Sequence, residues 1–339
     1  MAFDFSSSKP GPPQNENSRG LTITIVVPTL DRIDFLERCL DSIKQQTHVP
    51  DEIVVATHEW DSTTAAYLRS AAPFPCPIRQ SVTREKGVIA NMQAAINITK
   101  SNVVALLDDD VTLHPNWIEK VLCHFESQPR PSGVGGKDFL QDDPAGRQIE
   151  PLTRRVGVFA WTGHLSGNHH RGTGPPREVD VLKGCNCAYD GVLLRRIGLD
   201  HSLRGSGAQV GWELSLAFDI KKTGGRLVYD PSIQVDHWIA PRHDESLLNR
   251  TSTQTVEFQH MIYNGFCIMR RKAKLHHYWG HVTHALLWGN RSACGAIRSV
   301  LLVLSGDQDA WRRFAVVFHC WVESVRTTHR PARSTAPTT

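Results

Sequence analysis

The sequence predicts an α/β fold in which a mainly parallel sheet is flanked by helices, followed by a helical extension at the C-terminus. Short β-rich runs alternate with amphipathic runs from residue 21 to residue 126, which is typical of consecutive strand–helix–strand units. The chain has 339 residues, of which 40% are hydrophobic and 21% are charged. Those proportions are ordinary for a globular protein, so we expect one large α/β domain with an appendage.

The first part of the chain supplies four strand–helix pairs. We expect strands at 21–29, 51–57, 76–82 and 102–108, followed in turn by helices at 32–46, 61–72, 87–99 and 114–126. Apolar residues fall on one face of the first helix, at Ile33, Leu36, Leu40 and Ile43. Pro28 ends the first strand, and Pro115 suits the first turn of the fourth helix.

After residue 133 the alternation becomes looser. We expect a short strand at 133–137, a substrate-covering mobile loop at 141–178, a strand at 178–184, helices at 191–198 and 211–225, and a strand at 226–237. Residues 245–327 read as helices. The predicted organisation is a disordered leader at 1–19, an α/β domain at 20–240, a helical extension at 241–327 and a flexible tail at 328–339.

Composition excludes several classes of protein. The formal net charge is only +4 and no dense basic stripe is present, so we expect no nucleic-acid partner. No apolar run approaches the roughly 20 residues of a membrane-spanning helix, and the N-terminus lacks the pattern of a secretory signal. The eight cysteines show no metal or disulfide spacing. We therefore expect a cytoplasmic protein with reduced thiols.

Three adjacent carboxylates, Asp108, Asp109 and Asp110, follow the fourth predicted strand. Ligands of open parallel sheets bind at this edge. In an extended chain Asp108 and Asp110 point to one side and Asp109 to the other. Two carboxylates aimed at one spot suit Mg²⁺ or Mn²⁺, and such a cation would relieve the repulsion between these acids and a diphosphate. The alternative is that the three acids only cap the following helix.

Four motifs then occur in series: "TIVVPTLDR…FLERCLDSIKQQ", "ALLDDDVTLHPNWIEKVL", "LKGCNCAYDGVLLRRIGLD" and "GWELSLAFDIKKTGGRLVYDPSIQVDH". In order and spacing they resemble the family 2 glycosyltransferases, and they cover about residues 21–240. The resemblance implies a GT-A-like fold and an inverting, metal-dependent transfer of a sugar. The donor would be a nucleotide sugar, UDP-linked by default. The acceptor would be a hydroxyl of a glycan, a lipid-linked molecule or a polysaccharide precursor.

The resemblance also implies a nucleotide and metal site. Pro28 and Thr29 match the loop that borders the nucleotide. Asp108 matches the carboxylate on the ribose side of the nucleotide, and Asp109 is grouped with it. Asp110 matches the carboxylate that binds the cation, and a His at position 237 can complete the metal site.

The same resemblance implies a second group of residues near the transferred sugar and its acceptor. The small-residue turn of this group is Gly184, Cys185 and Asn186. Glu213 matches the catalytic base, and Trp212 is assigned to packing or to a platform for the acceptor sugar. From the sequence alone, Glu213 could instead be a helix-dipole partner, and His237 a structural histidine.

Two departures from the family pattern concern the donor. Ala56 and Thr57 stand where the family usually has Asp residues after the second strand. Met92 and Gln93 replace an Arg–Asn pair. The identity of the nucleobase is therefore left open. Arg84 or Lys86 could neutralise the charge of the donor's phosphates.

Two other functions remain open on the sequence alone. A sugar nucleotidyltransferase would also use an α/β sheet and Mg²⁺, but it should carry a Gly-rich basic loop after the first strand, where this chain has "PTLDRIDF". A non-catalytic nucleotide-sugar-binding protein would bind the donor without transferring its sugar.

The C-terminal stretches "AIRSVLLVLSG" and "WRRFAVVFHCWVESVR" are strongly apolar, with Arg and Trp at their edges. Three roles are open for them: covering the sheet, forming a homo-oligomer contact, or lying on a membrane surface. The last role would place the protein on the cytoplasmic face of a membrane. Histidines at 277, 281 and 284 share a helical face, which we interpret as an amphipathic face and not as a zinc site.

Overall fold

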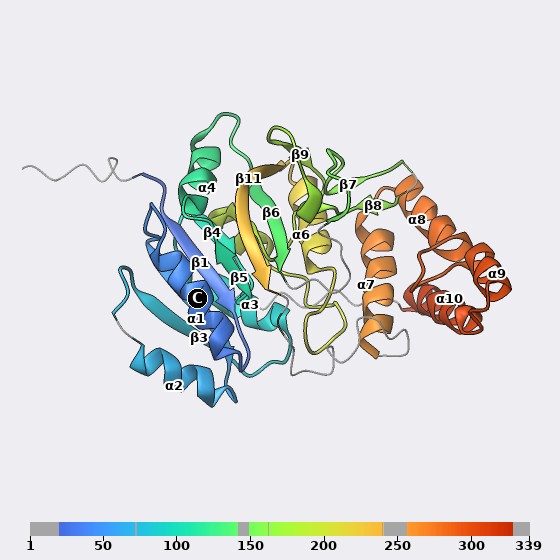
Figure 1. Cartoon of the computed structure of the whole chain (residues 1–339), viewed down its shortest axis with the longest axis horizontal. Helices are drawn as coiled ribbons and strands as arrows, with labels where there is room; N and C mark the ends of the chain where they lie inside the picture. The colour runs from blue at the N-terminus through green and yellow to red at the C-terminus, as the bar shows by residue number, and fades with distance from the viewer. Residues whose placement is uncertain are drawn as a thin grey trace, which may run out of the picture.

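The structure is a computed structural model, and it describes residues 20–327 except 72, 142–148, 162, 239 and 241–255. The predicted leader and tail therefore lie outside the described residues. Figure 1 shows a twisted central sheet with helices packed on it and a group of helices at one end of the molecule.

Among the described residues, nine strands form one sheet in the order β3-β2-β1-β4-β10-β6-β11-β5, with β9 paired to β11 off this path. They are β1 (Ile23–Pro28), β2 (Glu52–His58), β3 (Ile78–Thr83), β4 (Val103–Leu106), β5 (Val111–Leu113), β6 (Gly133–Gln141), β9 (Arg177–Val179), β10 (Cys187–Asp190) and β11 (Leu227–Trp238). The four strands from β3 to β4 are parallel, as are β6 and β11. This confirms the mainly parallel α/β prediction.

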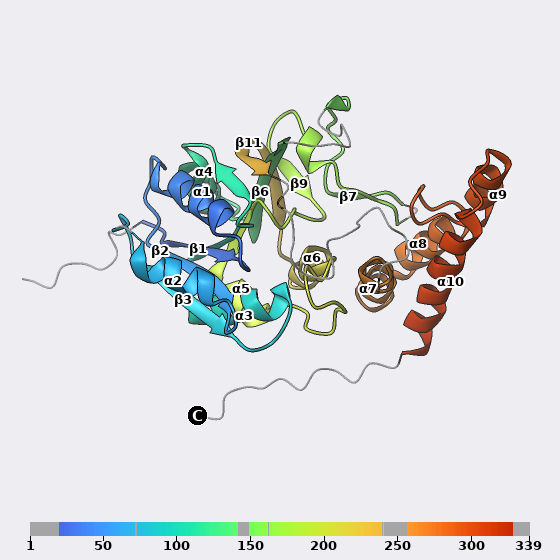
Figure 2. The same cartoon turned by 60° about the horizontal axis from the view of Figure 1, so that its bottom comes forward.

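Helices cover both faces of the sheet (Figure 2). They are α1 (Ile33–Lys44), α2 (Ser62–Ser70), α3 (Val88–Ile98), α4 (Trp117–Glu126), α5 (Gly191–Ile197) and α6 (Trp212–Lys222). One core joins α1 and α4 to the sheet through residues such as Leu36 and Trp117. The other joins α3, α5 and α6 through Met92, Leu194 and Leu216. Every residue of β1 is buried, which explains its unbroken apolar run.

The second half of the sheet differs from the sequence prediction. β6 runs for nine residues instead of five. The strand expected at 178–184 ends at Val179, and the unexpected strand β10 follows at Cys187. β10 lies antiparallel between β4 and β6, with its first three residues fully buried in the sheet. No element was expected at Cys187–Asp190, because four residues are too few to show a period.

The described part of the loop expected at 141–178 also contains regular structure. β7 (Val158–Phe159) and β8 (Leu165–Ser166) form a small antiparallel pair, and a 3-10 helix, η3, follows at His169–Arg171. Tyr229 of β11 donates a hydrogen bond to the carbonyl of His169 at 2.8 Å. This contact fixes η3 against the sheet.

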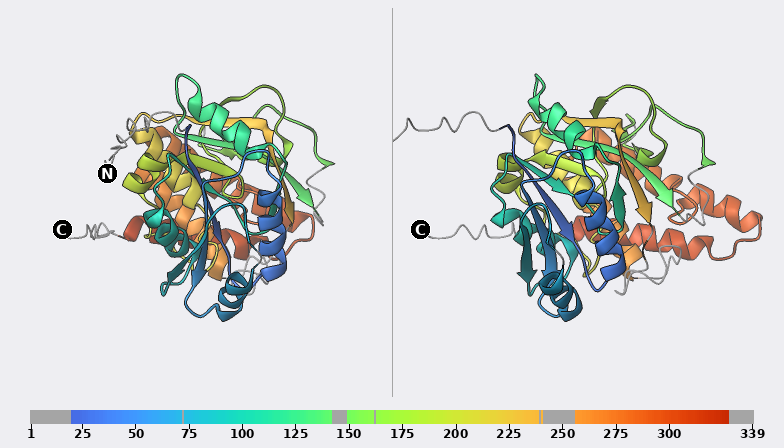
Figure 3. Two further views of the ribbon diagram at one scale, coloured as in Figure 1. Left: turned by 90° about the vertical axis from the view of Figure 1, so that its left-hand side faces the viewer. Right: turned by 60° about the vertical axis from the view of Figure 1, so that its left-hand side comes forward.

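Four helices form the C-terminal extension: α7 (Val256–Lys272), α8 (Leu275–Leu287), α9 (Ala296–Leu304) and α10 (Ala310–Arg326). α7 packs on the α/β domain, where Lys272 bonds to Asp219 of α6 at 2.5 Å and Arg204 stacks on Tyr263. Figure 3 shows the remaining helices extending away from the sheet. None of the described helices is both long enough and apolar enough to cross a bilayer.

Candidate active site

Asp109 is the most deeply buried of the three adjacent carboxylates, and its side chain is fully buried. Its Oδ2 accepts hydrogen bonds from Thr29 Oγ1 at 2.6 Å and from Arg32 Nε at 3.0 Å, and Arg32 Nη2 bonds to Oδ1. Burial raises the pKa of Asp109 to about 7, although Arg32 opposes this shift. Asp109 therefore holds the loop after β1, including Thr29, against the turn after β4.

Asp110 points instead toward β11. His237 stands opposite Val111 in the antiparallel β5–β11 pair, so its side chain reaches the carboxylate one residue earlier. His237 Nε2 lies 3.4 Å from Asp110 Oδ1. Asp110 Oδ2 accepts a hydrogen bond from the Ala240 amide at 3.3 Å and lies 3.9 Å from Arg32 Nη1.

The third carboxylate, Asp108, belongs to the same cluster. Asp108, Cys185 and His237 each offer one ligand atom, and these atoms all lie within 4.8 Å of one another. Asp108 and Asp110 thus lie on the side of His237, and Asp109 points away from it. The alternation expected from an extended chain holds, although β4 itself ends at Leu106.

Another buried acid, Asp138 of β6, lies on the other side of the His237 ring. Asp138 Oδ2 is 3.6 Å from His237 Nδ1, and the same carboxylate forms an ion pair with Lys183. Burial alone would raise the pKa of Asp138, but Lys183 and His237 hold it well below its usual range. Neither Asp138 nor Lys183 was predicted from the sequence. No local pattern marks either residue, because Asp138 follows Lys137 within β6 and Lys183 stands next to the turn at Gly184.

The donor atoms around His237 fit a divalent cation. Asp110 Oδ1 is buried and has no hydrogen-bond partner, which is costly unless a ligand completes it. Against burial, the carboxylates of Asp110 and Asp138 raise the pKa of His237 to about 12. A cation would bind the ring only in its neutral form, so cation binding at His237 would release the Nε2 proton. Burial raises the pKa of Cys185, so its neutral thiol is a poor ligand for a hard cation. The carboxylates of Asp108 and Asp110 and the imidazole of His237 therefore form a donor set that fits Mn²⁺ or Mg²⁺.

Glu213 lies beside this cluster, in the first turn of α6. Its side chain is partly exposed. Burial raises the pKa of Glu213 and Asp108 raises it further, while backbone hydrogen bonds from Glu213 and Gly184 oppose the shift. A Cβ on Gly184 would lie 2.8 Å from Glu213 Oε1 and 2.5 Å from Trp212 Cζ2. Glycine at this position therefore lets the turn approach the carboxylate closely.

Asn186, the last residue of that turn, is fully buried. Its Oδ1 accepts a hydrogen bond from Trp117 Nε1 at 2.8 Å, and its Nδ2 donates to the carbonyls of Lys137 and Ile233 at 3.1 and 3.2 Å. These contacts join α4, β6 and β11. The turn's position under the cluster is thus fixed by Asn186, while Gly184 and Cys185 face the acids.

The remaining predicted residues lie at or after the ends of β1 and β3. Pro28 is buried at the end of β1, opposite Ala56. Arg84 is largely exposed and pairs with Glu59 at 2.9 Å. Lys86 precedes α3, where the amide of Val88 bonds to the carbonyl of Gly207 at 2.9 Å. The structure therefore brings Asp108, Asp110, Gly184, Cys185, Glu213 and His237 together, with Arg84 on the surface.

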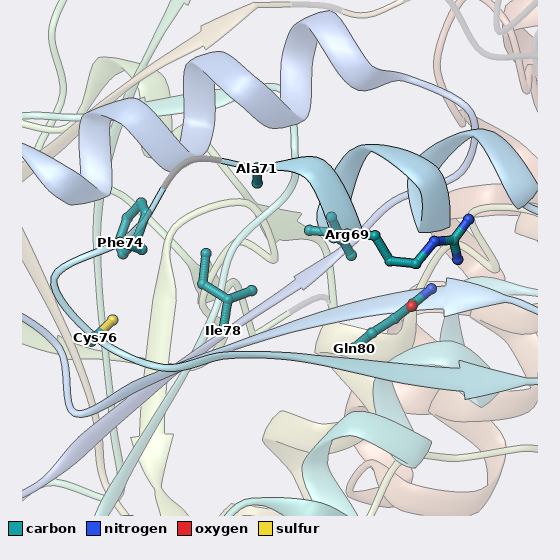
Figure 4. Close-up of a pocket in the computed structure, with 7 residues that line it drawn as sticks. Arg69, Ala71, Phe74, Cys76, Ile78 and Gln80 are labelled. Atoms are coloured by element: carbon teal, nitrogen blue, oxygen red, sulfur yellow. The ribbon is translucent and has the colours of Figure 1, made fainter.

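A hollow of about 300 Å³ lies elsewhere, between α2 and β3 (Figure 4). Phe74, Cys76 and Ile78 line it, together with Arg69 and Gln80 at one side. β3 is an edge strand, three strands away from β4. The hollow is thus separate from the carboxylate cluster.

Known proteins resemble the part of the chain that carries the three adjacent carboxylates of this site. Residues 24–180 match the family model described as glycosyl transferase family 2. A glucosyl-dolichyl phosphate glucuronosyltransferase from Haloferax volcanii is 23% identical over 224 residues, which cover 64% of this chain and 69% of that protein. The uncharacterized glycosyltransferase YwdF of Bacillus subtilis is 27% identical over 151 residues, and the match covers 51% of its length.

Solved structures show the same fold. A mannosyltransferase from Pyrobaculum calidifontis, in complex with GDP-Man and Mn²⁺, superposes with a TM-score of 0.56 at 16% identity, covering 95% of this chain and 92% of that one. TarS residues 1–349 of S. aureus, in complex with UDP-GlcNAc, gives a TM-score of 0.58 at 12% identity, with 90% and 82% covered.

Proposed function

Because the chain is a glycosyltransferase with a family 2 domain on the GT-A fold, we propose that it transfers a sugar from a nucleoside diphosphate donor to a hydroxyl acceptor. The transfer inverts the anomeric configuration and depends on a divalent cation. The observation that carries this proposal is the convergence of Asp108, Asp110 and His237, with Asp110 Oδ1 buried and unbonded. The glycosyltransferase relatives favour this reaction over sugar nucleotidyl transfer.

Asp110 and His237 would hold the cation, with Asp108 toward the nucleotide. When bound, the cation would neutralise the negative charge on the departing nucleoside diphosphate. Mn²⁺ is present with GDP-Man in the mannosyltransferase structure, which supports a cation at this site. Asp138 orients the ring of His237 through Nδ1 and thereby presents Nε2 to Asp110.

Glu213 is the proposed general base. In a single displacement, the acceptor oxygen attacks the anomeric carbon, the bond to the diphosphate oxygen breaks, and Glu213 takes the hydroxyl proton. The carboxylate lies in the first turn of α6 beside Gly184, and burial and Asp108 raise its pKa toward the working pH. A base with such a pKa accepts a proton more readily than an ordinary carboxylate.

The donor site lies over the ends of β1, β2 and β4. The amide of Asp31 donates to Asp61 Oδ2 at 3.0 Å, which ties the loop after β1 to the loop after β2. In that second loop, the Trp60 ring stacks on His58 at a centroid distance of 4.5 Å, and its side chain is half exposed. We assign this pair to stacking against the nucleobase, since Ala56 and Thr57 carry no carboxylate to read it. UDP stays the default nucleotide, supported by the UDP complexes of TarS.

The acceptor is a hydroxyl of a glycan or of a lipid-linked sugar. One relative is named for glucuronosyl transfer involving glucosyl-dolichyl phosphate, which favours the lipid-linked class. Trp212 is buried against Gly184 and supports the turn beneath the acceptor.

A panel of nucleotide sugars tests the proposed donor. Each is added to the purified protein with Mn²⁺, and the melting temperature is measured, because a ligand that binds the native state stabilises it. One nucleotide sugar should raise the melting temperature and should also be hydrolysed slowly or transferred to an added acceptor. Stabilisation by free nucleoside monophosphates alone, with no donor turnover, would contradict the proposal.

A further inference from the structure

Helix α9 buries a polar side chain and exposes its apolar face, which is the reverse of an ordinary surface helix. Its one fully buried residue is Ser299. Its large apolar side chains, at the i, i+3, i+4 and i+7 spacing of one helical face, are exposed: Ile297 by 47%, Val300 by 44%, Leu301 by 53% and Leu304 by 80%. A surface helix normally buries such a stripe, so α9 presents it to a partner outside the described chain.

The neighbouring helix α10 carries a row of aromatic rings. Trp311, Phe314, Phe318 and Trp321 contact one another in succession, with centroid distances of 5.7, 6.2 and 5.7 Å. Trp311 and Phe318 are each 46% exposed. The Ser299 hydroxyl of α9 bonds to the carbonyl of Ala310 at 3.3 Å, so the two helices are packed together. We call the exposed stripe of α9 and the aromatic row of α10 the outer face.

The outer face lies at the end of the molecule furthest from β1, β2 and β3 (Figures 1 and 2). The α/β domain is therefore not what these side chains cover, and the sequence alternative of packing on the sheet does not describe them. Smaller side chains on the adjoining side of α10, at Ala310, Val317, Cys320 and Ser324, make the buried contact.

The charges around the outer face are mainly positive. Residues 273–321 contain Lys274, Arg291, Arg298, Arg312 and Arg313 against two acids, Asp307 and Asp309. Asp307 pairs with Arg313 at 2.5 Å, and Asp309 lies 3.8 Å from Arg312. The Arg298 guanidinium lies 5.3 Å from the centre of the Trp288 ring. Arg312, next to Trp311, has a side chain 79% exposed. Apolar and aromatic side chains bordered by arginine are the pattern of helices that lie in a membrane interface.

We propose that the outer face binds the surface of an anionic lipid bilayer, with α9 and α10 lying along it. A second copy of the chain fits less well, because a two-fold contact would bring the net positive borders of both copies together. The inference rests on α8, α9 and α10 and not on the proposed transfer reaction. It also does not need the acceptor to be a lipid.

Vesicle co-sedimentation of the full chain, without donor or acceptor, tests this inference. We expect the protein to sediment with vesicles of phosphatidylcholine and phosphatidylglycerol, and much less with phosphatidylcholine alone. Binding should weaken as salt is added, because surface charge attraction is screened.

Two variants and one control locate the contact. Leu304→Glu places a charge at the most exposed point of the α9 stripe, and Arg312→Glu reverses a border charge. Each should lower the fraction bound to mixed vesicles by about 5-fold or more, the factor that corresponds to about 1 kcal/mol per surface charge. Val192→Glu is the matched control, because Val192 is 64% exposed on α5, far from the outer face. It should bind like the wild type, and circular dichroism checks that all three variants fold.

Three results would overturn the inference. The first is wild-type protein that does not sediment with mixed vesicles. The second is equal sedimentation of the wild type, Leu304→Glu and Val192→Glu. The third is a stable dimer, measured by light scattering without vesicles, that Leu304→Glu dissociates, because the outer face would then be an interface between two copies.

Discussion

His237 Nε2 lies 3.4 Å from Asp110 Oδ1, although 127 residues separate the two in the chain. The antiparallel pairing of β5 with β11 places them together, since it sets Val111 opposite His237. On the far side of the ring, Asp138 approaches Nδ1 at 3.6 Å. One histidine is thus held between two carboxylates, of which Asp110 faces the proposed donor and Asp138 faces the sheet.

Asp138→Asn should weaken cation binding by about 10- to 100-fold, the range measured when a carboxylate behind a metal-bound histidine is removed. The amide keeps the shape of the side chain but no longer fixes the ring through a charge. Titration of Mn²⁺ by calorimetry measures the effect. Asp230→Asn is a control, because Asp230 bonds to His124 at 2.8 Å and not to His237. Equal Mn²⁺ affinity of the wild type and Asp138→Asn would show that Asp138 has no part in the site.

Lys183→Met should lower the free energy of unfolding by about 3 kcal/mol, because it leaves the fully buried Asp138 carboxylate without its ion-pair partner. The matched control is Lys221→Met. Lys221 pairs with Asp180 at 2.6 Å, but both side chains are about one-third exposed, so the loss should stay below about 1 kcal/mol. Urea unfolding measures both variants. Similar losses would mean that the Lys183–Asp138 pair behaves as a surface pair.

Glu213→Gln should lower turnover by about 10²- to 10⁴-fold while donor affinity hardly changes, because glutamine cannot accept the acceptor's proton. The stability of Glu213→Gln also shows whether Glu213 acts as a base or only as a partner of the helix dipole. The pKa of Glu213 is raised in the folded protein, so ionisation at neutral pH costs stability, and replacing it should raise the melting temperature. A dipole role predicts the reverse: a loss of up to about 1 kcal/mol with nearly normal turnover.

The pH profile of turnover should follow the same group. A base works only when it is ionised, so kcat/KM should fall as the pH drops through the raised pKa of Glu213, and the falling limb should lie above pH 4.5, the group's ordinary value. Steady-state rates across pH, with cation saturating throughout, measure this limb. A profile that stays flat down to pH 4.5 would contradict the assignment of Glu213 as the base.

Gly184→Ala should lower turnover more than stability. The added Cβ would lie 2.8 Å from Glu213 Oε1 and 2.5 Å from Trp212 Cζ2, so the turn or the carboxylate must shift. Parallel measurement of transfer rate and melting temperature checks this. Gly265→Ala is the control, because nothing lies within 4 Å of its added Cβ. If Gly184→Ala keeps full turnover, the close approach of the turn to Glu213 does not matter for transfer.

The sequence predicts the first half of the sheet well because each strand there is a continuous apolar run followed by an amphipathic helix. It predicts β10 badly, because Cys187–Asp190 is short and lies between strands that run in the opposite direction. The pairing of Asp110 with His237 came from the family resemblance. No local pattern shows that β5 and β11 are neighbours.

Asp138 and Lys183 were missed for a related reason. No local pattern marks either residue, and only the pairing of β6 with β11 brings Asp138 to the ring of His237. Asp109 shows the opposite case. Its place among three acids suggested a ligand, whereas the structure places it in a buried pair with Arg32.

Donor binding with and without Mn²⁺, measured by calorimetry on the wild type, Asp110→Asn and Asp236→Asn, tests the central claim most directly. Asp236 is the control, since it precedes His237 but bonds to Gln141 at 3.0 Å. We predict that the wild type and Asp236→Asn bind the donor only with Mn²⁺ and lose it with chelator, and that Asp110→Asn fails to bind it in either condition. Donor binding and transfer that survive chelation unchanged would contradict the account.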